Sequence, residues 1–60
     1  MNNSEIGAAF VAMVNGAMEK KDIKGRNNLS ITTDGKNVTL WSYNTAIAYY
    51  YDNKELAIVS

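Results

Sequence analysis

The chain has 60 residues, 47% of them hydrophobic, and six basic and six acidic side chains give it a formal net charge of zero. A chain of this length forms one small domain with a marginal core, here residues 1–60, and such domains usually need a disulfide, a metal ion or a partner subunit. Cys and His are both absent, which excludes disulfides and removes the usual zinc ligands. We therefore expect a homodimer.

Charge and the N-terminal residues restrict partners and location. The chain lacks the basic excess that neutralises nucleic-acid phosphates, so nucleic acid is a disfavoured partner. The opening Met-Asn-Asn-Ser does not have the basic and apolar regions of a signal peptide. Residues 6–18, the longest mostly apolar segment, fall short of the ~20 residues of a membrane-spanning helix. We expect a cytoplasmic protein with no membrane contact.

Residues 2 to about 24 are predicted to form one helix. Asn2 and Glu5 have the spacing of a capping box, with Ser4 as a rival cap. Apolar residues recur at three- and four-residue intervals, as in an amphipathic helix: Ile6, Phe10, Met13, Val14 and Ala17. Three lysines between residues 20 and 24 oppose the negative pole of the helix dipole, and Gly25 follows as a terminating residue.

A second face of the predicted helix is small or apolar rather than charged and contains Ala8, Ala9, Val11, Ala12 and Gly16. Glycine costs about 1 kcal/mol in a helix interior relative to Ala. Gly16 therefore either ends the helix at Asn15-Gly16 or permits another backbone to pack closely, and we favour close packing. A helix of about 20 residues is ~30 Å long and would overhang a small sheet. Met18 and Ile23 would then contact a second subunit.

After residue 28 the apolar pattern changes from helical to alternating. The alternation predicts antiparallel strands at about residues 29–33, 36–42, 45–51 and 54–59. Turn signals separate them at Asp34-Gly35, Tyr43-Asn44 and Asp52-Asn53. Residues 41–51 also permit a second interpretation, in which they form one long, bulged strand.

The three turns agree on one apolar face of the sheet. They place Ile31 opposite Val38, Leu40 opposite Ile47, and Tyr49 opposite Leu56. The shared face contains Leu29, Ile31, Val38, Leu40, Ile47, Tyr49, Leu56 and Ile58. A slip of one residue would send part of this set to the other side. The predicted fold is therefore α+β, with one N-terminal helix packed on a four-stranded antiparallel meander.

The opposite face of this sheet is polar near its first strand and apolar near its last two, so we expect a partner to cover it. The last strand is also an exposed edge without Pro. The dimer would form through the last strands or the overhanging helix. Candidate residues for the dimer interface or for partner binding are Trp41, Tyr43, Tyr50, Tyr51, Ala57, Val59, Ala12, Gly16 and Met18.

Catalytic residues, metal ligands and cofactors are not predicted. No His accompanies any Ser or Thr as a base, and the four glycines are too dispersed for a phosphate-binding loop. Trp41 and Tyr50 could stack on the bases of a single-stranded nucleic acid, with Lys36 and Arg26 nearby. Neutral charge favours an interface role for both aromatic residues instead.

Residues 42–48, Ser-Tyr-Asn-Thr-Ala-Ile-Ala, carry a resemblance to a known group. The segment resembles one that recurs in small uncharacterised bacteriophage proteins, with the pattern Ser-Tyr-Asn-Thr-x-Ile/Val-Ala. With its flanking residues the resembling segment runs from 40 to 49, about ten of the sixty positions, and the Ser-x-Thr-Thr-type stretch that often follows in the group is absent from this sequence. The resemblance implies a viral accessory protein expressed inside a bacterium, and such proteins frequently bind and block a host or defence protein.

The leading expectation is thus a small non-enzymatic protein-binding module, a phage accessory protein that blocks a host or bacterial-defence protein as a homodimer in the bacterial cytoplasm. Two alternatives remain at this point. One is a small accessory protein that binds single-stranded nucleic acid, and the other is a purely structural dimer.

Overall fold

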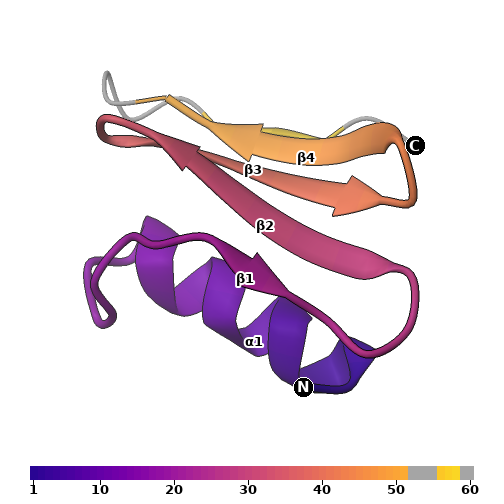
Figure 1. The fold of residues 1–60 in the computed structure, drawn as a ribbon. Coiled ribbons are helices and arrows are strands. Elements are labelled where there is room, and N and C mark those ends of the chain that lie inside the picture. Colours follow the sequence, from indigo (N-terminus) through magenta and orange to yellow (C-terminus); the bar gives the residue numbers. More distant parts are fainter. Residues whose placement is uncertain (52–55, 59–60) are drawn as a thin grey trace.

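The computed structural model describes residues 1–51 and 56–58. Within these residues lie one helix, α1 (Asn3–Val14), and five strands: β1 (Ile23–Lys24), β2 (Leu29–Asp34), β3 (Asn37–Ser42), β4 (Thr45–Tyr50) and β5 (Leu56–Ile58). The strands form one antiparallel sheet in chain order. The helix α1 packs on one face of the sheet, mainly against β2 and β3 (Figure 1). The predicted α+β class is confirmed.

The start of α1 follows its sequence signal. The Asn2 side chain accepts a hydrogen bond of 2.8 Å from the Glu5 backbone N–H, and the Glu5 carboxylate accepts one of 2.9 Å from the Asn2 N–H. This reciprocal pair is the predicted capping box, and Ser4 lies inside the helix rather than capping it. Within the described residues, no helix is long and apolar enough to cross a membrane.

The end of α1 differs from the prediction of a helix to about residue 24, which is wrong. The helix ends at Val14, and Gly16 adopts a left-handed backbone with φ of 77°. Its N–H donates to the Met13 carbonyl at 3.3 Å, while the Ala17 N–H donates to the Ala12 carbonyl at 2.8 Å. These two bonds form a Schellman motif, so Gly16 terminates the helix instead of permitting close packing within it.

Twelve residues make a helix of only ~18 Å, so the expected overhang does not occur. Met18 and Ile23, assigned to a second subunit from the sequence, pack against the core of their own chain. Ile23 belongs to β1, which pairs with β2 at Ile31. The sheet therefore has a strand inside the segment predicted as helix. The expectation of four strands missed it.

The first hairpin turns one residue later than predicted. Its central residues are Gly35 and Lys36, with Asp34 opposite Asn37. Gly35 has a φ of 63°, which suits a turn with glycine at the first central position. Ile31 consequently lies opposite Leu40 rather than Val38. This shift moves the pairing by two residues, and because alternation has a period of two, the apolar face is unchanged.

The second hairpin has the predicted turn at Tyr43-Asn44, followed by a β-bulge. Near the turn, Trp41 lies opposite Ala46, as the sequence predicts, but Leu40 lies opposite Ala48. Ile47 is thus the extra residue, and the rest of β4 is displaced by one position. The predicted pairing of Leu40 with Ile47 is wrong for this reason.

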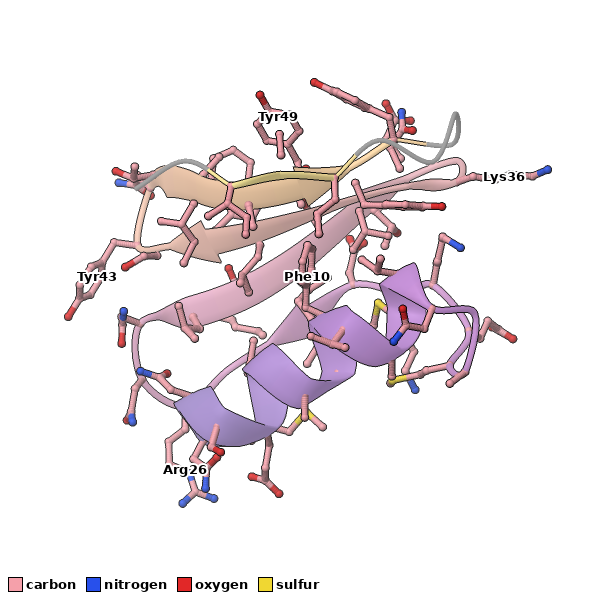
Figure 2. The ribbon with its side chains drawn as sticks, turned by 180° about the vertical axis from the view of Figure 1, so that it is seen from behind. Phe10, Arg26, Lys36, Tyr43 and Tyr49 are labelled. Atoms are coloured by element: carbon pink, nitrogen blue, oxygen red, sulfur yellow. The ribbon has the colours of Figure 1, made fainter. Side chains whose placement is uncertain are left out.

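The bulge exchanges the faces of the residues that follow it in β4. Ala48, expected on the opposite face, is buried in the core. Tyr49, expected in the core, points away from the side of the sheet that α1 covers (Figure 2). Tyr50 lies opposite Val38 and Leu56, on the helix side. Tyr49 therefore does not pair with Leu56, and the predicted Asp52-Asn53 turn lies outside the described residues.

The core forms where α1 meets the middle of the sheet. Its members are the buried residues Ile6, Ala9, Phe10 and Met13 of the helix and Ile31, Val38 and Ala48 of the strands. Leu29 and Leu40 pack against this cluster, as their places in the predicted face require. The predicted apolar face is thus confirmed for β2 and β3, the two predicted strands that precede the bulge.

Asn28 joins three parts of the fold that are distant in sequence. Its side chain accepts a hydrogen bond of 2.6 Å from Asn3 Nδ2 and donates one of 2.9 Å to Ser42 Oγ. Its backbone carbonyl accepts the Tyr43 N–H at 2.8 Å. Hydrogen bonds of Asn28 therefore tie the start of the helix and the β3–β4 turn to the segment before β2.

Substituting Gly16 should destabilise the protein, because an L-residue disfavours its left-handed backbone. A Cβ at Gly16 or at Gly7 would meet no described atom within 4 Å, so neither substitution creates a clash. Gly16→Ala should lower the free energy of unfolding by about 1 kcal/mol. Gly7→Ala, in the helix interior, should raise it by up to about 1 kcal/mol. Urea unfolding measures both, and equal signs would contradict the Schellman assignment.

Removing the Asn28 side chain should destabilise the junction. Asn28→Ala removes the oxygen that accepts the hydrogen bond of Asn3 Nδ2. The buried Asn3 Oδ1 already makes no hydrogen bond with a described residue, so the whole Asn3 amide would then be unsatisfied. The free energy of unfolding should fall by about 1–3 kcal/mol. The neighbouring Asn27 is exposed, so Asn27→Ala should change it by less than about 0.5 kcal/mol. Equal urea midpoints for the two variants would refute the role of Asn28.

Candidate functional site

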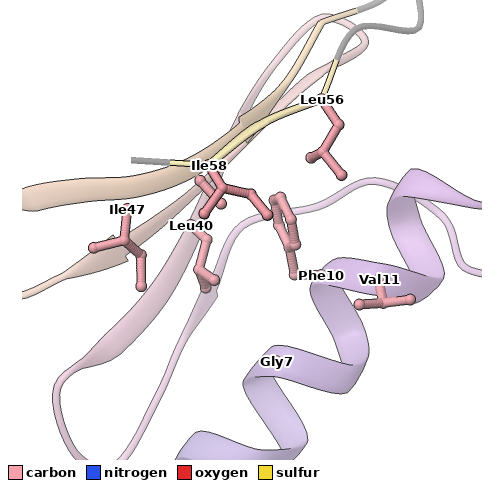
Figure 3. Close-up of a pocket in the computed structure, with 8 residues that line it drawn as sticks. Gly7, Phe10, Val11, Leu40, Ile47, Leu56 and Ile58 are labelled. Atoms are coloured by element: carbon pink, nitrogen blue, oxygen red, sulfur yellow. The ribbon is translucent and has the colours of Figure 1, made fainter. Parts of the chain in front are cut away.

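An open apolar groove lies between α1 and the β4–β5 half of the sheet (Figure 3). Its volume is about 560 Å³. The helix contributes Gly7, Phe10 and Val11, β3 contributes Leu40, β4 contributes Ile47 and Ala48, and β5 contributes Leu56 and Ile58. We call this surface the apolar groove.

The apolar groove exists because one helix is too narrow for the sheet. Strands are spaced by ~4.8 Å, so the five strands span ~19 Å between their outer axes, whereas a helix with its side chains is ~10 Å wide. Among the described residues, α1 lies mainly over β2 and β3, Phe10 of the helix packs with Ala48 of β4, and the helix side of β5 stays exposed at Leu56 and Ile58. Three lining side chains remain strongly exposed: Val11 at 55%, Leu56 at 51% and Ile58 at 77%.

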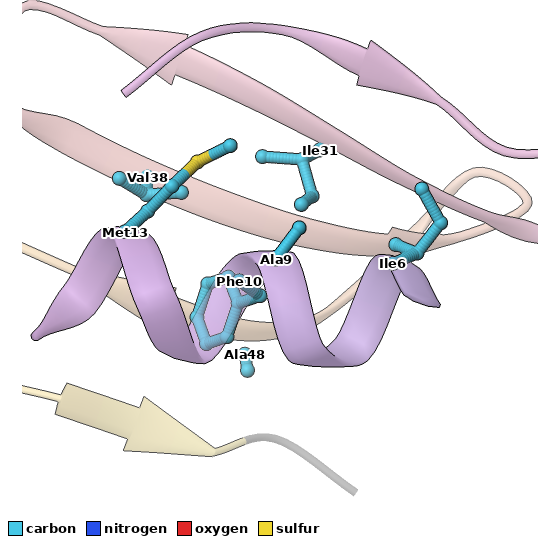
Figure 4. Close-up of a cluster of buried hydrophobic side chains, with 7 residues drawn as sticks. All are labelled: Ile6, Ala9, Phe10, Met13, Ile31, Val38 and Ala48. Atoms are coloured by element: carbon cyan, nitrogen blue, oxygen red, sulfur yellow. The ribbon is translucent and has the colours of Figure 1, made fainter. Parts of the chain in front are cut away.

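The floor of the groove is continuous with the core. Phe10 and Ala48 line the groove and also belong to the buried cluster (Figure 4). The β-bulge brings Ile47 and Ala48, which are neighbours in sequence, to the same lining. Strict alternation would have sent one of them to the other face. The groove is therefore built on packed residues rather than on a loop.

The chemistry of the groove follows from its lining. The described residues around it are aliphatic or aromatic, apart from Gly7, and carry no side-chain donor, acceptor or charge. Such a surface can remove apolar side chains of another molecule from water, at about 25 cal/mol for each Å² buried. Elsewhere in the described part of the chain, no three acidic side chains gather as a set of metal ligands.

Trp41, one of the residues predicted to contact a partner, lies on the sheet face opposite α1, which we call the outer face. Its indole N–H donates a hydrogen bond of 2.7 Å to Thr32 Oγ1 on the neighbouring strand. Tyr49 shares this face, and its ring lies 5.0 Å from the ring of Tyr51, which is 45% exposed. The outer face thus brings Trp41 and Tyr51 to one side of the molecule, together with a tyrosine that the sequence assigned to the core.

Tyr43 and Tyr50 lie elsewhere. Tyr43 occupies the β3–β4 turn with a φ of 54° and is 79% exposed, pointing into solvent (Figure 2). Tyr50 is half-buried on the helix side, where the Lys20 ammonium lies 6.0 Å from its ring centroid. Trp41 and Tyr50, paired in the sequence analysis as a base-stacking platform, therefore lie on opposite faces.

The remaining predicted site residues fall into different surroundings. Ala12 is half-buried and its carbonyl accepts the Ala17 and Met18 N–H groups at the helix end. Gly16 forms the turn, and Met18 packs on the core. Ala57 lies opposite Tyr49 in the sheet, and Val59 lies outside the described residues.

The alternating sequence pattern did not predict the apolar groove, because it placed Ile47, Leu56 and Ile58 on a core face expected to be covered by the helix. Their side of the sheet was correct, since these residues do line the helix side. The error lay in assuming that the helix covers every strand. The turn signal at Asn15-Gly16, which gives a short helix, and the ~10 Å width of any helix could together have revealed the groove.

Comparison with family models, with curated proteins and with solved structures finds no match for this chain. The function is therefore argued from the geometry of its own residues.

Thr32→Val should release the indole of Trp41. The variant removes the hydroxyl that accepts the Nε1–H, so the emission of the single tryptophan should shift to longer wavelength. The free energy of unfolding should fall by about 0.5–1 kcal/mol. Thr39→Val changes the same residue type on the outer face and should leave the emission unchanged. Identical spectra for the two variants would show that the hydrogen bond does not form in solution.

Proposed function

We propose that this chain is a non-enzymatic protein-binding module that works as a homodimer, with the apolar groove as its docking surface for protein. The exposure of Val11, Leu56 and Ile58 around one continuous groove carries the proposal. The largest exposed apolar patch on a typical monomeric protein covers roughly 300–600 Å² and is often functional. The uncharged lining suits a protein surface better than a phosphate or a polar substrate.

The specific form of this function is a phage accessory protein that blocks a host or bacterial-defence protein in the cytoplasm of the infected bacterium. Support for it comes from the resemblance of residues 42–48 to small bacteriophage proteins. In this form the outer face, with Trp41 and the Tyr49–Tyr51 pair, is the surface available to the target. Tyrosine and tryptophan are common energetic centres of protein interfaces.

The position of Tyr50 weakens the single-stranded nucleic-acid alternative. That function relied on Trp41 and Tyr50 acting together, and the two residues are separated by the sheet. The purely structural dimer uses the same groove and differs only in having no target.

Capture from a bacterial lysate tests the proposal. The immobilised chain should retain one host protein, and Ile58→Lys should abolish retention because a buried charge in the apolar groove prevents formation of the homodimer that presents the outer face. Asn27→Lys adds the same charge at an exposed position away from the groove and should retain the host protein as the wild type does. Equal retention by both variants, or no protein retained by the wild type, would contradict the proposal.

A further inference from the structure

The solvent-facing side of α1 lacks the charges that a surface helix usually carries. Ser4, Ala8, Val11 and Asn15 follow one another at three- and four-residue spacing on this side, and all four are exposed. Glu5 is the single charged residue of the helix, and its carboxylate is engaged in the capping box. A helix that is apolar or small on most of its circumference is normally covered on more than one side.

The exposed apolar surface beside α1 lies over β4 and β5. β4 and β5 together occupy ~10 Å, which is the diameter of a helix with its side chains. A helix placed there would lie two strands from α1, at ~10 Å, and neighbouring packed helices are 8–10 Å apart. The strand spacing beside α1 thus matches one additional helix in both width and distance.

We infer that the apolar groove receives α1 of a second copy of this chain, so that the solvent-facing side of each helix packs on β4 and β5 of the partner. This inference rests on the proposed function and names the occupant of its docking surface. In the resulting dimer, two sheets enclose a middle layer in which the two helices lie side by side.

One protomer supplies both halves of the required contact. The ridge is the side of α1 that includes Ala8 and Val11, and the receiving surface includes Leu56 and Ile58. A twofold-symmetric interface needs such self-complementary surfaces, because every contact occurs twice. The small side chains of Ser4 and Ala8 allow the partner sheet to approach the helix closely.

Charge and area also favour a second copy. Like charges would face each other across a twofold axis, and the ridge and groove contain none that is free of the capping box. Val11, Leu56 and Ile58 together expose on the order of 300 Å² per protomer, and a standard interface buries about 800 Å² per partner, slightly more than half of it apolar. The exposed side chains of Ser4, Ala8 and Asn15 on the ridge add to this area.

Light scattering tests the arrangement over a range of concentrations. The wild type should reach twice the chain mass of 6.6 kDa. Val11→Lys and Ala8→Lys should each weaken dimerisation at least ~100-fold, whereas Asn27→Lys should not change it. Ala8 does not line the groove of its own chain, so it discriminates between docking of α1 and docking of another surface. Positions 8 and 11 are exposed in the monomer and lysine is a good helix former, so both variants should fold. Circular dichroism checks this.

A cross-linking measurement covers the case in which a lysine variant fails to fold. Because the chain has no cysteine, a mixture of Ala8→Cys and Ile58→Cys chains should form a mixed disulfide dimer on mild oxidation. A mixture of Asn27→Cys and Ile58→Cys chains should not.

The outcomes separate this inference from the proposed function. A wild type that remains monomeric, a dimer insensitive to Ala8→Lys, or no mixed disulfide would overturn the inference. A monomer that still retains a host protein through Ile58 overturns it while leaving protein binding by the groove intact. A dimer that the wild type forms and both lysine variants lose supports the inference. If this wild-type dimer retains no host protein, the blocking function is refuted and the purely structural dimer is favoured.

Discussion

Coverage of the sheet by α1 determines which apolar side chains stay in contact with solvent. A single helix shields only two of the five strands well, and the sequence places apolar residues on the helix side of all of them. The buried cluster therefore ends at Ala48, although the apolar surface continues to Ile58. The marginal core of a 60-residue chain and its open groove have the same origin, which is a sheet wider than its cover.

The alternating pattern predicted the faces of β2 and β3 better than it predicted their pairing. A turn misplaced by one residue shifted the partner of Ile31 by two positions, and side-chain alternation tolerated the error. The bulge at Ile47 had no comparable tolerance, since a shift of one position exchanged the faces of Tyr49 and Tyr50. Aromatic and β-branched residues fit either face, so composition alone does not reveal where such a bulge occurs.

The sequence allows α1 to end in two places, at Asn15-Gly16 or near residue 24. Apolar spacing continued to Ala17, and several lysines followed, so the helical pattern outweighed the turn signal at Asn15-Gly16. The left-handed backbone of Gly16, together with the bonds from its N–H and that of Ala17, decided the matter. Because the helix ends at Val14, the segment that contains β1 can join the sheet. The groove remains because one helix is narrower than the sheet that results.

The bulge also decides which tyrosines of β4 lie on the outer face of the sheet. If β4 paired with β3 without the bulge, Tyr49 would turn toward the helix and Ala48 toward the outer face. The outward direction of the Tyr49–Tyr51 pair therefore depends on the place of the bulge in β4.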